Sequence, residues 1–143
     1  MDFPYTPLGK PFSVKQVNFG ELGWISDQKG YRYTPFHPET GRAWSPISHE
    51  IMNIRQYFQP DYARPECCLI NHYKEAAKMG LHQDTDEEDL DTPISSISLG
   101  QAARFRIFKA QSPSPTQSFL LEHRAENRIH FSARCSKGRV QTA

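Results

Sequence analysis

The sequence predicts a β-rich α+β domain in which one helix packs on an antiparallel sheet sandwich. Two observations carry this prediction. The 143 residues are 37% hydrophobic and include 11 prolines and 8 glycines, a balance typical of a folded chain with many short elements joined by turns. One helical pattern is followed by several short β-prone segments, an order that favours a helix against an antiparallel sheet. The length fits one domain with one core.

The N-terminal part begins with a strand. Residues 12–19 (FSVKQVNF) are rich in β-branched and aromatic side chains and are followed by Gly20, which predicts a strand that ends at a turn. Residues 30–46 carry three prolines and two glycines. They are therefore expected to form a long ordered loop or a pair of short hairpin arms.

A helix is expected next. Ser45 and Pro46 provide an N-cap and a first-turn proline, and Pro60 ends the pattern. Between them, apolar residues recur at helical spacing at Ile47, Ile51, Ile54 and Phe58.

The second half of the chain is predicted to consist mainly of strands. Four short β-prone segments are separated by turn residues, at 67–73 (CCLINHY), 94–99, 103–108 and 118–121. Residues 111–118 (QSPSPTQS) are expected to be a loop. Residues 124–143 are rich in arginine and have few apolar side chains, so they are predicted to be a basic tail without a full core strand.

Charge and cysteine content exclude some classes of protein. The formal net charge is +1, which by itself does not predict a nucleic-acid partner. The three cysteines (Cys67, Cys68 and Cys135) lack zinc spacing, which indicates a reduced, cytoplasmic chain. No apolar run has the length of a signal-peptide core or a membrane span, so we expect a protein that is neither secreted nor membrane-spanning.

The acidic run LHQDTDEEDLDTP at 81–93 is a candidate metal site. A calcium loop that starts at Asp84 is excluded, because Asp89 stands where the turn glycine is needed and Ser95 where the bidentate glutamate is needed. His82 and Asp84 are two residues apart, so in an extended segment both point the same way and could bind one ion. Two histidines and one carboxylate form a common Fe(II) site. The alternative is a solvated acidic loop.

Residues 67–100, CCLINHYKEAAKMGLHQDTDEEDLDTPISSISLG, resemble the AlkB family of iron(II)- and 2-oxoglutarate-dependent dioxygenases. That family has a Leu-Ile-Asn-x-Tyr strand, a His-x-Asp motif, an acidic stretch, Pro-Ile and a Ser-x-Ser-Leu-Gly strand, all present here in order. The upstream residues NFGELGWISDQKGYRYTPFHPETGRAW resemble the nucleotide-recognition region of the family.

The resemblance implies a double-stranded β-helix, or jelly roll, with a helix packed on the sheet. It implies oxidative dealkylation of nucleic-acid bases with Fe(II), 2-oxoglutarate and O2, a DNA-repair activity. By position, His82 and Asp84 would be iron ligands, and Asn71 and Tyr73 would hydrogen-bond 2-oxoglutarate. An amide and a phenol can both donate to carboxylate oxygens from one strand face.

The resemblance also implies residues for the nucleic acid. Trp24, Tyr31 and Tyr33 match the region that holds the substrate, since a base taken out of the stack needs aromatic surfaces. Asp86 matches a residue that faces the base. The alternative for the aromatic residues is ordinary core or loop packing. The partner would be alkylated DNA or RNA, preferably single-stranded, and the protein a monomer without membrane contact.

After Glu122 and His123, the sequence departs from the family pattern. The apolar strand and the glycine turn that precede the family's third iron ligand are missing, and Ser132 stands where that histidine is expected. His130 is the candidate third ligand, with a surface histidine as the alternative. Either Arg134 or Arg139 could pair with a carboxylate, but no strand is expected to hold them.

These departures imply a domain over residues 1–123 whose jelly roll is incomplete at its C-terminal end, followed by the basic tail at 124–143. They leave two alternatives to an active enzyme. One is an impaired relative that only binds nucleic acid weakly, and the other is an unstable fragment.

Overall fold

The structure is a computed structural model that describes residues 4–74, 77–80, 82–83, 92–100, 102–108, 115–121, 129–134 and 141–142. Strands dominate it, and these residues contain one helix. None of the described helical structure is long and apolar enough to cross a membrane.

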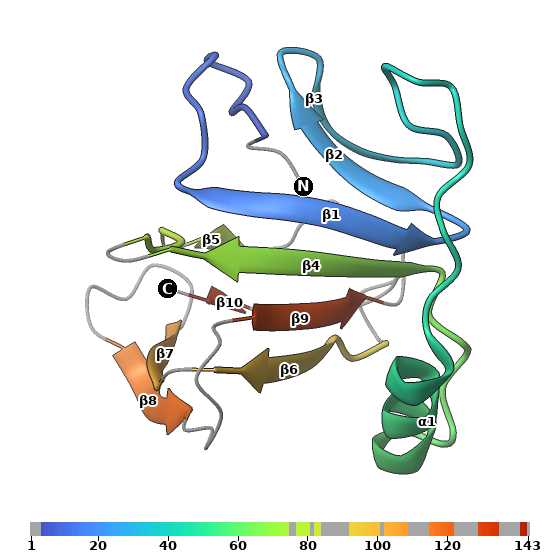
Figure 1. Cartoon of the computed structure of the whole chain (residues 1–143). Coiled ribbons are helices and arrows are strands. Elements are labelled where there is room, and N and C mark those ends of the chain that lie inside the picture. Colours follow the sequence, from blue (N-terminus) through green and yellow to red (C-terminus); the bar gives the residue numbers. More distant parts are fainter. Residues whose placement is uncertain are drawn as a thin grey trace.

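A four-stranded sheet forms the centre of the molecule (Figure 1). Its order is β1 (Val14–Gly20), β4 (Cys67–Tyr73), β9 (Ile129–Arg134) and β6 (Ser95–Leu99), and each neighbouring pair is antiparallel. The register is continuous from Val14 opposite Tyr73 to Gly20 opposite Cys67. β4 therefore has a partner on both sides.

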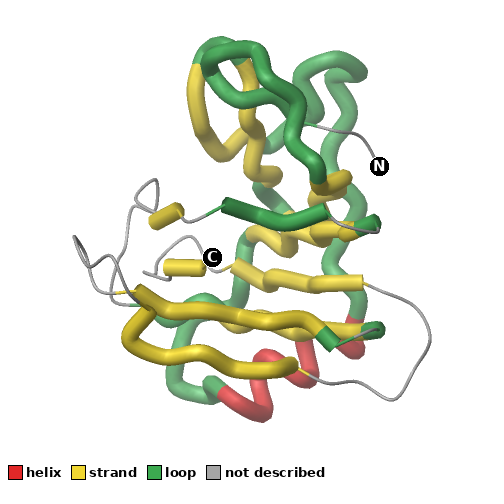
Figure 2. Tube along the Cα trace, turned by 90° about the vertical axis from the view of Figure 1, so that its left-hand side faces the viewer, coloured by secondary structure: helices red, strands yellow, loops and turns green. Residues whose placement is uncertain are grey.

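Three smaller pairs surround this sheet. β2 (Gly23–Asp27) and β3 (Gly30–Thr34) form a hairpin, and so do β7 (Ala103–Phe108) and β8 (Pro115–Leu121). β5 (His82–Gln83) pairs with β10 (Gln141–Thr142). The β2–β3 hairpin lies at the opposite end of the molecule from the helix, as the turned view also shows (Figure 2).

The core lies along β1 and β4. Val14, Cys67, Cys68 and Leu69 are almost fully buried. Such an apolar run on β4 is expected for a strand that has neighbours on both edges and is covered on both faces. The predicted strands at 12–19, 67–73, 94–99 and 103–108 are confirmed, with small shifts at the ends of the first and third.

The helix is confirmed, but its start is not where the sequence placed it. α1 runs from His49 to Phe58, and its N-cap is Ser48, whose side chain accepts from the Ile51 amide. The predicted N-cap, Ser45, instead accepts at its backbone carbonyl from the Gly20 amide at 2.8 Å. Ser45 therefore lies beside the end of β1 in space, and the helix begins after it.

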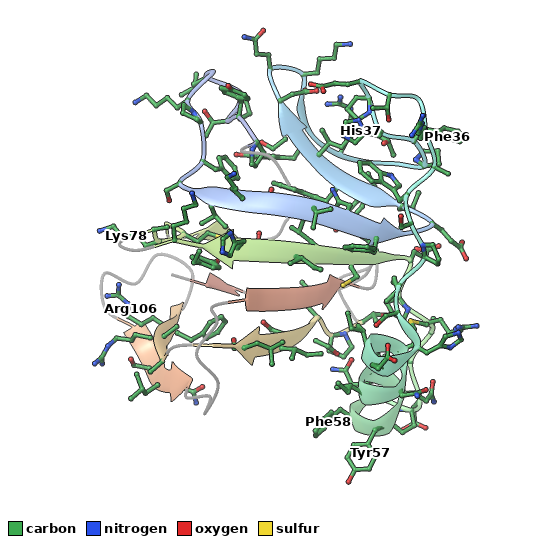
Figure 3. The ribbon with its side chains drawn as sticks, in the orientation of Figure 1. Phe36, His37, Tyr57, Phe58, Lys78 and Arg106 are labelled. Atoms are coloured by element: carbon green, nitrogen blue, oxygen red, sulfur yellow. The ribbon has the colours of Figure 1, made fainter. Side chains whose placement is uncertain are left out.

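The expected apolar stripe of this helix does not become its buried face. Phe58 is 72% exposed and Ile54 is 41% exposed, whereas Arg55 is buried. Tyr57 and Phe58 project from the end of α1 away from the sheet (Figure 3). Arg55 instead donates from Nη1 to the carbonyl of Gln59 at 2.7 Å, and Gln59 accepts from the Ser95 hydroxyl on β6. The C-cap of the helix is therefore joined to β6 by a side-chain hydrogen bond.

Two further expectations are corrected. Ile129–Arg134 forms β9, an inner strand of the sheet, so the tail does contain a full core strand and Arg134 is held in it. β8 begins at Pro115, inside the segment 111–118 that was expected to be a loop. In both cases pairing with a neighbouring strand outweighs weak local propensity.

Candidate functional site

Asn71 is the best-defined polar residue of the candidate site. It lies on β4 and is 4% exposed. Gln16 stands directly opposite it on β1, and Gln16 Nε2 donates to Asn71 Oδ1 at 2.7 Å. The acceptor end of the Asn71 amide is therefore occupied by the protein itself. Its Nδ2 end is the one available to an acceptor such as a carboxylate.

Tyr73 lies two residues further along β4, as the sequence predicted. Its hydroxyl donates to Sδ of Met79 at 3.9 Å, a weak hydrogen bond. The same loop is tied to the residue before β1, because the Ser13 hydroxyl donates to the carbonyl of Lys78 at 2.9 Å. These two contacts fix residues 77–80, which lead into the segment with His82.

The predicted metal ligands are described only in part. His82 lies in β5, where it is opposite Thr142 of β10. His130 lies in β9 opposite both Asn71 on β4 and Ser98 on β6. Asp84 and Asp86 lie outside the described residues. The structure thus brings His130 into register with a predicted 2-oxoglutarate residue, and iron binding by these three residues stays a prediction.

An aromatic stack is built on the β2–β3 hairpin. The rings of Trp24 and Tyr31 are 5.4 Å apart with an interplanar angle of 15°. Tyr33 is opposite Trp24 in the register, and the ring of Phe12 lies 6.5 Å from the indole at an interplanar angle of 42°. Tyr31 is 44% exposed, so part of this stack is open to solvent. The structure brings the three predicted aromatic residues together on one hairpin.

Asn18 fixes the backbone of Trp24. Its Oδ1 accepts from the Trp24 amide and its Nδ2 donates to the Trp24 carbonyl, both at 2.9 Å. Asn18 and Gln16 were not among the site residues predicted from the sequence. The signal was available, because Val14, Gln16 and Asn18 alternate along one face of a strand, and a polar side chain on a buried face must find a partner.

An ion pair closes the same hairpin. Arg32 donates from Nη1 and Nη2 to the two carboxylate oxygens of Asp27, at 2.8 and 2.7 Å. The hydrogen bond from Arg32, followed by one from the Lys29 amide, lowers the pKa of Asp27 to about 2. Both side chains are about one third exposed, so the pair organises the turn more than it stabilises the molecule.

The loop that follows β3 packs on the hairpin from the other side. Trp44 donates from Nε1 to the carbonyl of Thr34 at 2.8 Å, and its ring lies 5.2 Å from the ring of His37. Gly23 leaves the space that the indole occupies, since a Cβ there would overlap Trp44. Phe36, in the same loop, is exposed (Figure 3). This packing fixes the β2–β3 hairpin at the start of β2.

Comparison with known proteins gives consistent results. The profile of the 2OG-Fe(II) oxygenase superfamily matches residues 2–134. The alpha-ketoglutarate-dependent dioxygenase AlkB homolog of Caulobacter vibrioides is 45% identical over 116 residues, which are 81% of this chain and 53% of that protein. The alpha-ketoglutarate-dependent dioxygenase AlkB of Escherichia coli is 41% identical over 123 residues, with 82% and 56% covered.

A solved structure shares the fold. The structure of OsALKBH1 matches with a TM-score of 0.65 at 23% identity, over 92% of this chain and 65% of that one. This likeness supports a jelly-roll type of fold for the strand-rich structure. The chain spans about half the length of the curated relatives it matches. From the matched profile and these relatives, the chain belongs to the 2OG-Fe(II) oxygenase superfamily and, within it, to the AlkB family.

Proposed function

We propose that this chain acts in the oxidative dealkylation of alkylated bases in DNA, with RNA as the alternative substrate. The observation that carries the proposal is the arrangement around β4. This strand holds Asn71 and Tyr73, and it lies between β1 and β9, which carries His130 opposite Asn71. β1 in turn fixes the aromatic stack through Asn18. One strand and its two neighbours thus connect residues for a cosubstrate, a metal and a base.

The residues fit the proposed groups chemically. Asn71 keeps its donor end for a carboxylate of 2-oxoglutarate, because Gln16 occupies its acceptor end. His82, Asp84 and His130 are the set of two imidazoles and one carboxylate that suits Fe(II). Bound Fe(II), with O2 and 2-oxoglutarate, would supply the oxidation of the alkyl carbon, which leaves as an aldehyde while 2-oxoglutarate becomes succinate and carbon dioxide.

The residues of the chain would bind and orient the substrate. Trp24 and Tyr31 offer flat surfaces on which an unstacked base can lie, at a cost that is lowest for single-stranded or damaged nucleic acid. Asp86 would face the base, where a carboxylate can accept from an exocyclic amine or favour a cationic lesion. Single-stranded alkylated nucleic acid is therefore the proposed partner, and the proposed state is a cytoplasmic monomer.

The incomplete jelly roll remains part of the proposal. The division into a domain at 1–123 and a basic tail at 124–143 stays a prediction, and Ile129–Arg134 of that tail forms a strand of the four-stranded sheet. Arg134 is opposite Cys67 in the register and His130 opposite Asn71. In this proposal the tail would supply His130 as the third iron ligand.

Turnover tests the proposal. The purified chain with Fe(II), 2-oxoglutarate and O2 is expected to release succinate in proportion to the removal of methyl groups from a methylated single-stranded oligonucleotide. His82→Ala is expected to abolish both, and Gln83→Ala, on the same short strand, serves as the control. Salt-sensitive binding of the oligonucleotide without turnover would instead support the alternative of a binding protein.

A further inference from the structure

Gln16 is not itself a predicted ligand of the cosubstrate, but it contacts Asn71, which is. It pairs with Asn71 across β1 and β4, and the distance from its Nε2 to Asn71 Oδ1 is 2.7 Å. Directly opposite residues in an antiparallel pair have side chains on the same face of the sheet. Asn71 is 4% exposed, so this hydrogen bond is largely shielded from water and its loss would leave a buried oxygen without a partner.

The direction of this hydrogen bond matters because an amide has two different ends. The oxygen only accepts and the nitrogen only donates, while a carboxylate only accepts. If the Asn71 amide turned by 180°, its oxygen would face a carboxylate and repel it. Within the described part of the chain, Oδ1 accepts from Gln16 and Nδ2 donates no hydrogen bond. Gln16 thus selects the orientation in which the donor end of Asn71 is free.

We propose that Gln16 is a positioning residue for the cosubstrate: it holds the Asn71 amide so that Nδ2 donates to a carboxylate of 2-oxoglutarate. This inference rests on the proposed function, because it takes Asn71 as a 2-oxoglutarate residue. Gln16 itself needs no contact with the cosubstrate. Its place is fixed by the regular β1–β4 register, so the orientation is set before the cosubstrate binds.

The same face of β1 carries a second amide with a comparable arrangement. Asn18, two residues beyond Gln16, holds the backbone of Trp24 by two hydrogen bonds. One strand face therefore fixes a residue of the proposed cosubstrate site and a residue of the proposed base site. The two amides act on separate partners, so variants of Gln16 and Asn18 are expected to affect different ligands.

The test is the affinity for 2-oxoglutarate, measured by calorimetry with Mn(II) in place of Fe(II) so that no oxidation occurs. Gln16→Met removes the donor, and Gln16→Glu keeps the shape but offers only acceptors. We expect affinity to fall roughly threefold to tenfold in Gln16→Met and by more than about tenfold in Gln16→Glu. Gln28→Glu, an exposed site with the same change of charge, is expected to stay within about twofold of the parent chain.

A double-mutant cycle shows whether Gln16 acts through Asn71. Asn71→Ala alone is expected to weaken binding, and adding Gln16→Met to it is expected to change nothing further. Each variant is also melted, because loss of the hydrogen bond leaves a buried oxygen unpaired and can lower the thermal midpoint by itself. A merely structural role would lower the midpoint while the folded variant still binds 2-oxoglutarate like the parent chain. The Glu variant, which keeps the shape, guards against a Met variant that does not fold. Kinetically, the KM for 2-oxoglutarate should rise while the KM for the oligonucleotide does not.

Two results overturn the inference, and they are distinguishable. If Asn71→Ala weakens binding but both Gln16 variants bind like the parent chain, or act equally without Asn71, Gln16 has no positioning role and the proposed function stands. If the parent chain itself does not bind 2-oxoglutarate, the proposed function fails and the inference fails with it.

Discussion

Asn18 shows how a single buried amide can organise a site. At 9% exposure, it donates to and accepts from the backbone of Trp24, and Sγ of Cys67 lies 3.7 Å from its Oδ1. A side chain that satisfies both backbone groups of one residue sets the path of the chain there. The position of the Trp24 ring against Tyr31 follows from this path.

Replacement of Asn18 by alanine is expected to lower the free energy of unfolding by about 1–3 kcal/mol, because two backbone groups lose their partners. Urea denaturation measures this change. Asn53→Ala, at an exposed position of α1, is the control and should change stability by less than about 0.5 kcal/mol. An Asn18→Ala chain as stable as the control would contradict the role given to this amide.

Asp27 makes the stability of the β2–β3 hairpin depend on pH. Since its pKa is lowered from 3.8 to about 2, its carboxylate stabilises the folded hairpin above pH 3.8, and this contribution is lost as the pH falls toward 2. An NMR titration of the Asp27 carboxyl is expected to have its midpoint near pH 2, and Arg32→Gln should move the midpoint up toward 3.8. An unshifted midpoint in the parent chain would show that the ion pair does not form.

At the scale of elements, Ser45 and Ser48 are both possible N-caps of α1, and local sequence alone does not decide between them. Ser45 precedes a proline and matches the pattern of an N-cap, but Ser48 provides the cap in the structure. The reason lies outside the helix. Ser45 is bridged to Phe19 at the end of β1, and its carbonyl accepts from the Gly20 amide, which holds Ser45 beside the sheet and outside the helix.

This difference gives a matched pair of variants. Ser48→Ala is expected to cost about 0.5–2 kcal/mol of folding free energy because the Ile51 amide loses its acceptor. Ser45→Ala keeps its backbone hydrogen bond and should cost much less. Thermal or urea unfolding of the two variants measures both losses of stability. If Ser45 were the N-cap, Ser45→Ala would cost more than Ser48→Ala.

The turn between β1 and β2 depends on Gly20. Its φ is +121°, and a Cβ there would overlap the carbonyl of Glu66. Gly20→Ala therefore combines backbone strain of about 1–3 kcal/mol with a clash against main-chain atoms that cannot rotate away. We expect a large drop in the thermal midpoint, while Gly41→Ala, with φ +65° but open space around it, should lose only the strain. Similar losses in both variants would argue against the close approach to Glu66.

At the scale of the whole molecule, the sequence predicted where the core strands lie along the chain better than which strands pair with each other. Residues 67–73 and 103–108 were placed to the residue, because β-branched and aromatic runs between turn residues leave little choice. The side-by-side position of Asn71 and His130 could not be predicted, since strand order depends on contacts between distant segments.

The same limit explains what the sequence analysis got wrong. β9 was overlooked because its segment IHFSAR has few apolar residues, and its place between β4 and β6 comes from hydrogen bonds that both neighbours offer. The apolar stripe of α1 remains largely exposed at Ile54 and Phe58 because the helix meets β6 through Gln59. Periodicity predicted the helix but not the face by which it is attached.

The most direct test of the account is an anaerobic titration of the purified chain with Fe(II) in the presence of 2-oxoglutarate. The weak visible metal-to-ligand charge-transfer band reports both groups bound at one site. The account predicts that the band appears in the parent chain, is lost in His82→Ala, and is weakened in His130→Ala and Asn71→Ala. A folded chain in which no band forms at any Fe(II) concentration would contradict the central claim that these strands assemble an iron and 2-oxoglutarate site.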